Sequence, residues 1–380
     1  MHVFLQQLIN GLSLGAIYAL IAVGYTMVYG VLRLINFAHG DIYMVGAMMG
    51  LYVATGSFSL FETARSHPGL WLPVALIAIA IVGFAIVLRA KRIKTHWTLD
   101  VAAKVVAATA ISALVMDLGG RLIHLSGAPS WRAFFVTILA AMVVCGCLGF
   151  VIELVAYRPL RDQPRITSLI TAIGISMFLE FGGQGVFGAT PQRFPDVAPI
   201  AQTADYVGAW QLPQTFHVLG VTVSFADTLI VAVTLVLMAG LTWIVKYTRT
   251  GMALRAVSFR FDTAALMGIN IDRIISFAFV LGSMLAAAGG VLVAVRSPSV
   301  TPLMGLMPGI KAFVAAVLGG IGNIPGAVAG GFLLGLVEVL VAAYMPQGSQ
   351  YRDAIAFVIL IAILLVKPTG LFGRNLVEKV

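Results

Sequence analysis

Long apolar stretches separated by short polar loops follow one another along the whole chain. Several of them exceed the roughly 18 to 20 residues that cross a hydrocarbon core of about 30 Å. The alternating pattern of a membrane barrel is absent, and lipid offers no partners to backbone groups, which favours helices. The pattern predicts an all-α polytopic membrane protein with about 10 to 11 transmembrane or re-entrant helices.

The expected segments are approximately 8–30, 41–56, 70–88, 97–118, 133–156, 166–188, 226–246, 274–296, 306–322, 326–345 and 353–366. Two of them, 41–56 and 306–322, are short enough to be half-crossings or re-entrant elements. Residues 1–7 lack the basic region of a signal peptide, so the first apolar run is expected to remain as a helix. We expect a single transmembrane domain over residues 1–380.

Composition and charge agree with this interpretation. The chain is 60% hydrophobic and 10% charged, which excludes a soluble fold. Its net charge of +9 is distributed unevenly, because one set of alternate loops holds 16 of the 24 Lys and Arg and the other holds six. The positive-inside rule places the first set and the C-terminus in the cytoplasm and, if every segment crosses, the N-terminus outside. A half-crossing at 41–56 or 306–322 would change the side of the N-terminus. We therefore attribute the basic residues to orientation in the membrane and expect no nucleic-acid partner.

Three regions interrupt the regular succession of spans. Residues 91–132 add a basic cluster, an apolar segment and an outward turn, which we interpret as an inserted helical hairpin. Residues 189–225 form a long outer loop in which an alternating run at 215–225 predicts two short strands around Gly220. That loop is either a surface cap or a docking surface for an external protein. Residues 247–273 form a long cytoplasmic loop.

The cytoplasmic loop contains an amphipathic run at 251–270 that is too polar to cross the membrane. Gly268 is expected to end a short helix there, and Asp272 to cap the helix that follows. Such a helix rests on lipid or docks in a groove on a partner protein. The expected anchor face is Ala253, Val257, Phe261, Ala264 and Ala265, with Arg255, Arg260, Asp262 and Thr263 elsewhere around the helix.

Ionisable and amide groups at membrane depth are costly, so each needs a structural or functional reason. Asn36, His39 and Asp41 lie at a helix break, where they cap a helix, face headgroups or line a path. Lys311 and Glu338 have opposite charge in neighbouring segments and are expected to form a buried pair. The path candidates are Asn36, His39, Asp41, Glu180, Lys311, Asn323 and Glu338.

Motifs for catalysis are missing from the sequence. It contains no Walker motif, no H-E-x-x-H zinc signature and no G-x-S-x-G elbow. The glycine-rich run at 319–326 lacks the Lys-Ser or Lys-Thr of a phosphate loop and predicts a broken helix or a tight turn. Cys145 and Cys147 have no accompanying ligand cluster and are expected to be packing residues. We expect no catalytic site, no metal and no cofactor in this chain.

Several runs carry a family resemblance. They are NGLSLGAIYALIAVGYTMVYG at 10–30, INFAHGD at 35–41, AYRPLR at 156–161, AALMGIN at 264–270, KAF at 311–313 and GGIGNIPG at 319–326. In order and over nearly the whole chain, they resemble the LivH-type permeases of branched-chain amino acid importers. The resemblance implies the ABC-importer permease fold and a path for leucine, isoleucine and valine across the bacterial inner membrane.

The resemblance also implies partners. ATP would be used by two cytoplasmic ATPase subunits, substrate would come from a periplasmic binding protein, and a second, different permease would complete a heterodimer. The loop at 251–270 resembles the coupling helix on which such ATPases dock. The implied coupling residues are Arg255, Val257, Arg260, Phe261, Asp262, Ala264, Ala265 and Gly268.

The chain departs from the family pattern in two places, and other functions stay open. Family members usually carry an acidic pair in the coupling helix, where this chain has Ser258, Phe259 and Arg260, with only Asp262 beyond. The insertion at 91–132 is the second departure. Alternatives are a permease for urea or short amides, an ion-coupled secondary transporter, or an intramembrane enzyme; the last lacks a nucleophile with a partnered base.

Overall fold

The computed structural model describes residues 2–32, 34, 36–56, 95–124, 129–161, 163–199, 215–218, 221–367 and 369–373. The expected segment at 70–88, Gly220, and parts of 91–132 and 189–225 lie outside these residues. The chain divides into two compact units. The first comprises Met1–Gly40, Pro199–Ile274 and Leu306–Val380, and the second comprises Asp41–Ala198 and Ile275–Gly305.

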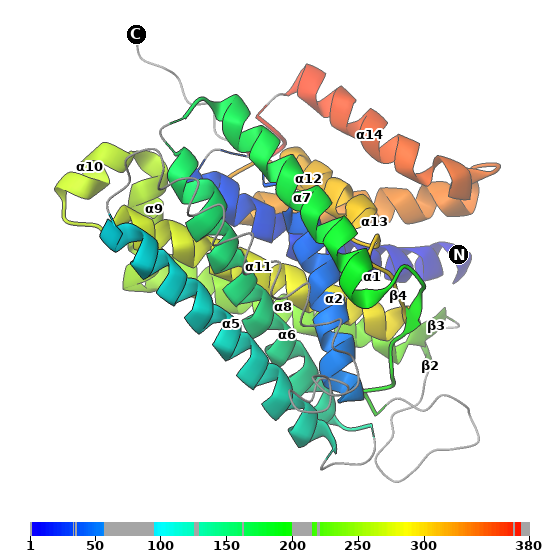
Figure 1. Ribbon diagram of the computed structural model, residues 1–380. Coiled ribbons are helices and arrows are strands. Elements are labelled where there is room, and N and C mark those ends of the chain that lie inside the picture. Colours follow the sequence, from blue (N-terminus) through cyan, green and yellow to red (C-terminus); the bar gives the residue numbers. More distant parts are fainter. Residues whose placement is uncertain are drawn as a thin grey trace. The chain divides into compact units, whose positions relative to one another are not determined.

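The first unit is built around α1 (His2–Leu32), which is apolar on all sides and buried over most of its length. A helix without a polar face lies either in lipid or among other helices, and most of α1 is covered by other helices. α8 (Phe225–Tyr247), α12 (Leu306–Gly319) and α13 (Ile324–Tyr344) pack directly on α1, and α14 (Gly348–Val366) packs on α12 and α13. These elements can be followed in Figure 1.

Small residues bring α1 and α13 together. A Cβ atom added at Gly331 would lie 2.4 Å from the Ala19 Cα atom, and one added at Gly335 would lie 2.4 Å from the Gly15 Cα atom. No side chain fits in that space, so the two backbones approach closely. The small-xxx-small pairs in both segments therefore serve this contact.

Two short strands pair between α1 and α8, as the alternating run at 215–225 predicts. β2 (Thr215–Val218) and β3 (Val221–Ser224) are antiparallel, with Thr215 opposite Ser224. The Gln6 amide fastens the hairpin to α1: its Nε2 donates to the Thr222 carbonyl at 2.8 Å, and its Oε1 accepts from the Thr222 N–H at 3.0 Å. The hairpin is thereby fixed to the start of α1.

The glycine-rich run at 319–326 forms a tight turn between α12 and α13. Gly320 and Gly322 have φ of 101° and 90°, which disfavours residues with a Cβ atom. The segment after α14 closes this turn, because the N–H groups of Leu371 and Phe372 donate to the Leu318 and Gly319 carbonyls at 2.8 and 3.2 Å. Of the two structures expected here, the tight turn is the one observed.

The second unit contains the remaining helices. They are α2 (His39–Thr55), α5 (Thr95–His124), α6 (Trp131–Ile152), a π-helical turn η1 (Glu153–Tyr157), a 3₁₀ turn η2 (Arg158–Leu160), α7 (Arg165–Phe187) and α11 (Ile271–Arg296). α5 and α6 lie side by side (Figure 1). Two residue pairs link β1 (Gln192–Arg193) to β4 (Ser299–Val300) in antiparallel fashion. α2 and α11, which run across the unit boundary, approach closely where a Cβ atom at Gly46 would lie 2.4 Å from the Ala287 Cα atom.

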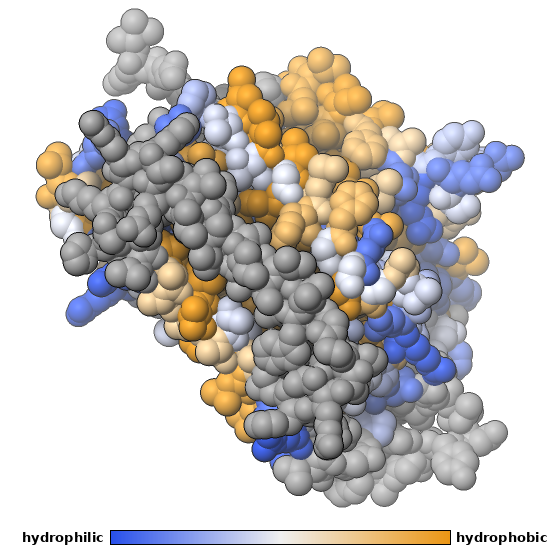
Figure 2. Space-filling view, viewed as in Figure 1, coloured by the Kyte–Doolittle hydropathy of each residue, from blue (hydrophilic) through white to orange (hydrophobic). Residues whose placement is uncertain are grey.

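Within the described residues, eight helices are long and apolar enough to cross a membrane. α2 and α12 are shorter, at 17 and 14 residues, in the two places where half-crossings are expected. Hydrophobic residues also cover much of the surface visible in Figure 2. Several large apolar side chains are more than 60% exposed, as expected for side chains that face lipid. They include Val106, Ile170, Val236 and Leu365. The described part of the chain is an all-α polytopic membrane fold.

Candidate functional site

The loop at 247–273 holds two helices instead of the single one expected at 251–270. Thr248 caps the N-terminus of α9 (Arg249–Phe259), because its hydroxyl accepts from the Gly251 N–H at 3.1 Å. Arg260 is extended, with φ of −150°, and separates α9 from α10 (Phe261–Leu266). Its N–H still donates to the Ala256 carbonyl and its carbonyl accepts from Ala264, so the break leaves few backbone groups unbonded.

The apolar face of this loop packs against its own unit, which corrects part of the expected docking surface. Val257 and Ala264 are 0% and 4% exposed. α9 lies against α8 and α1, and a Cβ atom at Gly251 would lie 2.3 Å from the Ile244 carbonyl oxygen. Hydrophobic periodicity identifies a covered face, but it does not say whether the chain itself or a partner covers it. Val257 and Ala264 are therefore core residues.

Another set of apolar residues remains uncovered. Phe259, Leu266 and Met267 are 73%, 87% and 80% exposed, at the ends of α9 and α10. Phe261 is half-buried. The exposed polar and small residues around them are Arg255, Arg260, Asp262, Ala265 and Gly268. We call Phe259, Leu266 and Met267 the exposed apolar triplet.

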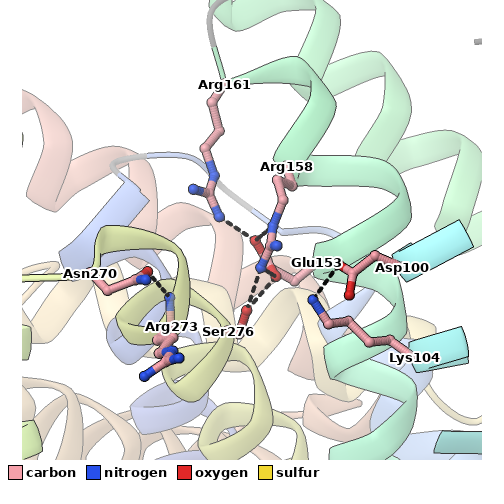
Figure 3. A network of polar contacts seen from close by, with 8 residues as sticks. All are labelled: Asp100, Lys104, Glu153, Arg158, Arg161, Asn270, Arg273 and Ser276. Carbon is pink, nitrogen blue, oxygen red and sulfur yellow. Dashed lines mark hydrogen bonds and ion pairs between the residues drawn. The ribbon is translucent and has the colours of Figure 1, made fainter. Parts of the chain in front are cut away.

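Gly268 ends α10, as expected. Its φ is +80°, its N–H donates to the Ala265 carbonyl, and the next N–H, of Ile269, donates to the Ala264 carbonyl. This is the Schellman arrangement, which favours glycine at that position. The cap of the following helix α11 is Asn270, because its Oδ1 accepts from the Arg273 N–H at 3.1 Å (Figure 3). The expected cap, Asp272, lies within the first turn instead.

The buried carboxylate of Glu153 pairs with two arginines just after the end of α6 (Figure 3). Glu153 is 0% exposed, and its Oε2 accepts from Arg158 at 3.1 Å and from the Ser276 hydroxyl at 2.6 Å. Arg161 pairs with the other carboxylate oxygen. Pro159 has no N–H to continue the α-helical ladder, so the helix widens and ends within this network.

The sequence alone does not predict this network, although the AYRPLR run at 156–161 supplies both of its arginines. Glu153 and Ser276 are 123 residues apart, and only the fold brings them together. A glutamate five residues before an arginine at the end of an apolar segment was the available signal. The network fixes the start of α11 to the end of α6.

The expected pair of Lys311 and Glu338 is confirmed. The Lys311 Nζ atom lies 2.8 Å from Glu338 Oε1 and 2.6 Å from Asp353 Oδ1. Tyr18 donates to the other Glu338 oxygen at 2.8 Å, and Arg352 Nε lies 3.6 Å from Oε1. Every charge in this cluster has a partner of opposite charge. The contacts join α1, α12, α13 and α14.

The polar residues near the break after α1 are deeply buried. Asn36 and His39 are 2% and 1% exposed, which excludes headgroup contact for His39 in this structure. The His39 ring lies edge-on to Tyr25, with centroids 4.6 Å apart. Tyr25 and Phe313 line a small cavity of about 10 Å³. These residues all belong to the first unit.

In the second unit, the Asp41 carboxylate accepts from the Ser176 hydroxyl of α7 at 2.5 Å. Glu180 follows Ser176 by one helical turn, is 9% exposed and interacts electrostatically with Asp41. Asp41 thus bonds to a neighbouring helix and lies in the first turn of α2.

Asn323, another of the expected path residues, forms hydrogen bonds with backbone groups. Its Oδ1 accepts from the Gly326 N–H, and its Nδ2 donates to the Phe372 carbonyl at 2.9 Å. These bonds cap α13 and hold the chain segment that follows α14, which accounts for an amide at this position.

Comparison with known proteins places these features in a family. The family model described as the permease component of branched-chain amino acid transport systems matches residues 7–117 and 99–364. The high-affinity branched-chain amino acid permease LivH of Escherichia coli K12 is 36% identical over 377 residues, 99% of this chain and 98% of LivH. BraD of Pseudomonas aeruginosa gives the same identity and coverage.

A probable LivH of the archaeon Methanocaldococcus jannaschii is 29% identical over 62% of this chain and 73% of its own length. No solved structure matches the chain. The two bacterial relatives cover almost the whole chain, and the family model extends across the described spans, the loop at 247–273 and the buried charge networks. The chain therefore belongs to the family of branched-chain amino acid transport system permeases.

Proposed function

We propose that this chain is the permease subunit of an ATP-driven importer and forms the path for leucine, isoleucine and valine. The observation that carries the proposal is the 36% identity to LivH over 99% of this chain. A relation of that extent includes every described span as well as the loops. The all-α membrane architecture, with eight long apolar helices among the described residues, is compatible with a path through a helix bundle.

We also propose that energy comes from two cytoplasmic ATPase subunits, which use ATP while this chain holds no cofactor. The exposed apolar triplet supports a docked partner, because Phe259, Leu266 and Met267 expose large side chains on a loop expected in the cytoplasm. Exposed apolar residues rimmed by polar ones are typical of protein contacts. Arg255, Arg260 and Asp262 would form that rim.

On the outer side, we propose that a periplasmic binding protein delivers substrate, and that a second, different permease completes the translocating pair in the bacterial inner membrane. The hairpin of β2 and β3 supports a docking role, since two hydrogen bonds with Gln6 hold it on α1. A fixed surface loses less conformational entropy on binding than a flexible loop does.

Uptake into proteoliposomes tests the proposal. The chain is reconstituted with the ATPases, second permease and binding protein proposed as its partners, and uptake of radiolabelled leucine is measured with internal ATP and no ion gradient. We expect ATP-dependent uptake in which valine and isoleucine compete. Uptake of urea or acetamide but not leucine would assign the chain to a different substrate, and uptake that needs an ion gradient would make it a secondary transporter.

A further inference from the structure

Two buried carboxylates in the second unit lack the basic partner that others have. Glu153 pairs with two arginines, and Glu338 pairs with Lys311. Asp41 and Glu180 are also buried, at 1% and 9% exposure, yet no basic side chain of the described residues forms an ion pair with either. A buried carboxylate without a cation is costly, so the pair is a place that a cation would stabilise.

The oxygens of this pair converge. The Ser176 hydroxyl donates to Asp41 Oδ2 at 2.5 Å, and Glu180 lies one turn farther along α7 on the same face. Glu180 Oε1 is fully buried without a hydrogen-bond partner among the described residues, and Asp41 interacts electrostatically with Glu180. Two carboxylates and a hydroxyl therefore offer acceptor oxygens in one place, and one of those oxygens is unused.

The depth of the position fits a substrate path. Ser176 is the midpoint of α7, which has 23 residues. Eleven residues on either side correspond to roughly 16 Å at a rise of about 1.5 Å per residue. If α7 crosses the bilayer, Asp41 and the start of α2 lie near its midplane, where transporters commonly bind their substrates beside broken helices.

We propose that Asp41, Ser176 and Glu180 form the position that takes the ammonium group of the amino acid as it crosses the membrane. The proposal rests on the proposed function and adds the chemistry by which this chain recognises that substrate. An ammonium group carries one positive charge and three N–H donors, which matches acceptors on two carboxylates and a hydroxyl. A neutral amide such as urea brings no charge to this position.

Amide variants test the position directly. Asp41→Asn and Glu180→Gln keep the shape of each side chain and remove its charge, whereas Asp227→Asn is the matched control. Asp227 is also buried and accepts from a serine hydroxyl, Ser13, at 2.6 Å. We expect leucine uptake to fall about tenfold or more in the first two variants and less than about twofold in the control, since a charge-assisted hydrogen bond contributes roughly 1.5 to 3 kcal/mol.

A second readout does not depend on transport. The Ser176→Cys variant, made in a chain that also carries Cys145→Ala and Cys147→Ala, is treated during ATP turnover with cationic and anionic methanethiosulfonates of similar size. We expect the cationic reagent to react about tenfold faster, because two carboxylates attract it. The preference should fall in the Asp41→Asn background, and excess leucine-loaded binding protein should slow the reaction.

The outcomes separate this inference from the proposed function. Wild-type leucine uptake together with normal uptake in Asp41→Asn and Glu180→Gln would overturn the ammonium site and leave the importer intact, because the pair would then hold only a proton. Failure of both reagents to react would also overturn it. Absence of leucine uptake in the wild type would instead contradict the proposed function, and the charge preference at the cysteine would still report whether the position attracts a cation.

Discussion

The ammonium group of Lys311 lies 2.8 Å from the carboxylate of Glu338, with side chains only 8% and 3% exposed. Among the described residues, removal of Lys311 leaves the buried Glu338 carboxylate with Arg352, 3.6 Å away, as its remaining ion-pair partner. We expect Lys311→Met to lower the free energy of unfolding by about 3 to 5 kcal/mol. Arg352→Met should cost about 1 kcal/mol or less, because Arg352 is 44% exposed and 3.6 Å from Glu338.

Thermal unfolding in detergent measures both variants. The double variant Lys311→Met with Glu338→Gln should recover part of the loss, since neither charge is then left alone. Additive effects of the two substitutions would contradict a direct interaction between the side chains.

The network at the end of α6 gives a second prediction. Glu153→Gln leaves Arg158 and Arg161 without their carboxylate and should destabilise the protein by about 3 kcal/mol or more. Ser276→Ala removes one neutral donor and should cost about 1 to 2 kcal/mol. Lys104→Met is the control, because the Lys104 and Asp100 side chains are 42% and 56% exposed and their pair contributes little. Equal melting temperatures for Glu153→Gln and the control would show that the network adds nothing to stability.

The exposed apolar triplet predicts where an ATPase docks. Leu266→Asp should reduce co-purification of the ATPases while the permease itself stays folded, because Leu266 is 87% exposed in the free chain. Ala264→Glu should instead lower the yield of folded permease, since Ala264 is 4% exposed and a glutamate there has no space or partner. Pull-down yield and size-exclusion profile are compared. Normal ATPase recovery with Leu266→Asp would remove the triplet from the contact.

A pair of glycine substitutions tests the packing of α1 on α13. Gly331→Ala places a Cβ atom 2.4 Å from the Ala19 Cα atom, so we expect a loss of about 1 to 3 kcal/mol from overpacking. Gly240→Ala in α8 meets no atom within 4 Å and should stabilise the helix by up to about 1 kcal/mol. The two changes in melting temperature should have opposite signs. An unchanged or higher melting temperature for Gly331→Ala would show that α1 and α13 separate without strain.

Cysteine labelling tests the orientation in the membrane. With the native cysteines replaced by alanine, Thr222→Cys in the hairpin should react with an impermeant maleimide in spheroplasts. Leu266→Cys in the cytoplasmic loop should react only after lysis. The reverse pattern would invert the assignment based on the distribution of Lys and Arg.

Local patterns predict the helices and strands of this protein well, because each span is a continuous run of mostly apolar residues. The strands at 215–224 and the stop at Gly268 follow from short-range rules in the same way. Lys311 and Glu338 were predictable because opposite charges in adjacent segments have few other partners. The helix break at Arg260 was not predicted, since no glycine or proline marks it.

Contacts between distant segments are what the sequence did not reveal. Ser176 and Asp41 are 135 residues apart, and nothing local predicts that one bonds to the other. The face of α9 was assigned to a partner for a related reason: periodicity gives the direction of an apolar face but not its neighbour. A hydrophobic face becomes an interface prediction only when the exposure of its residues is known, as it is for Phe259 and Leu266.

The close approach of α1 and α13 has a consequence for biosynthesis. Gly15 meets Gly335, which the ribosome adds more than 300 residues later. At about 5 to 20 residues per second, α1 waits in the bilayer for roughly 15 to 60 s before its partner emerges. Its glycine-lined face is exposed to lipid or to the insertion machinery throughout that time. α1 therefore enters the membrane long before α13 and reaches its final packing only after α13 has emerged.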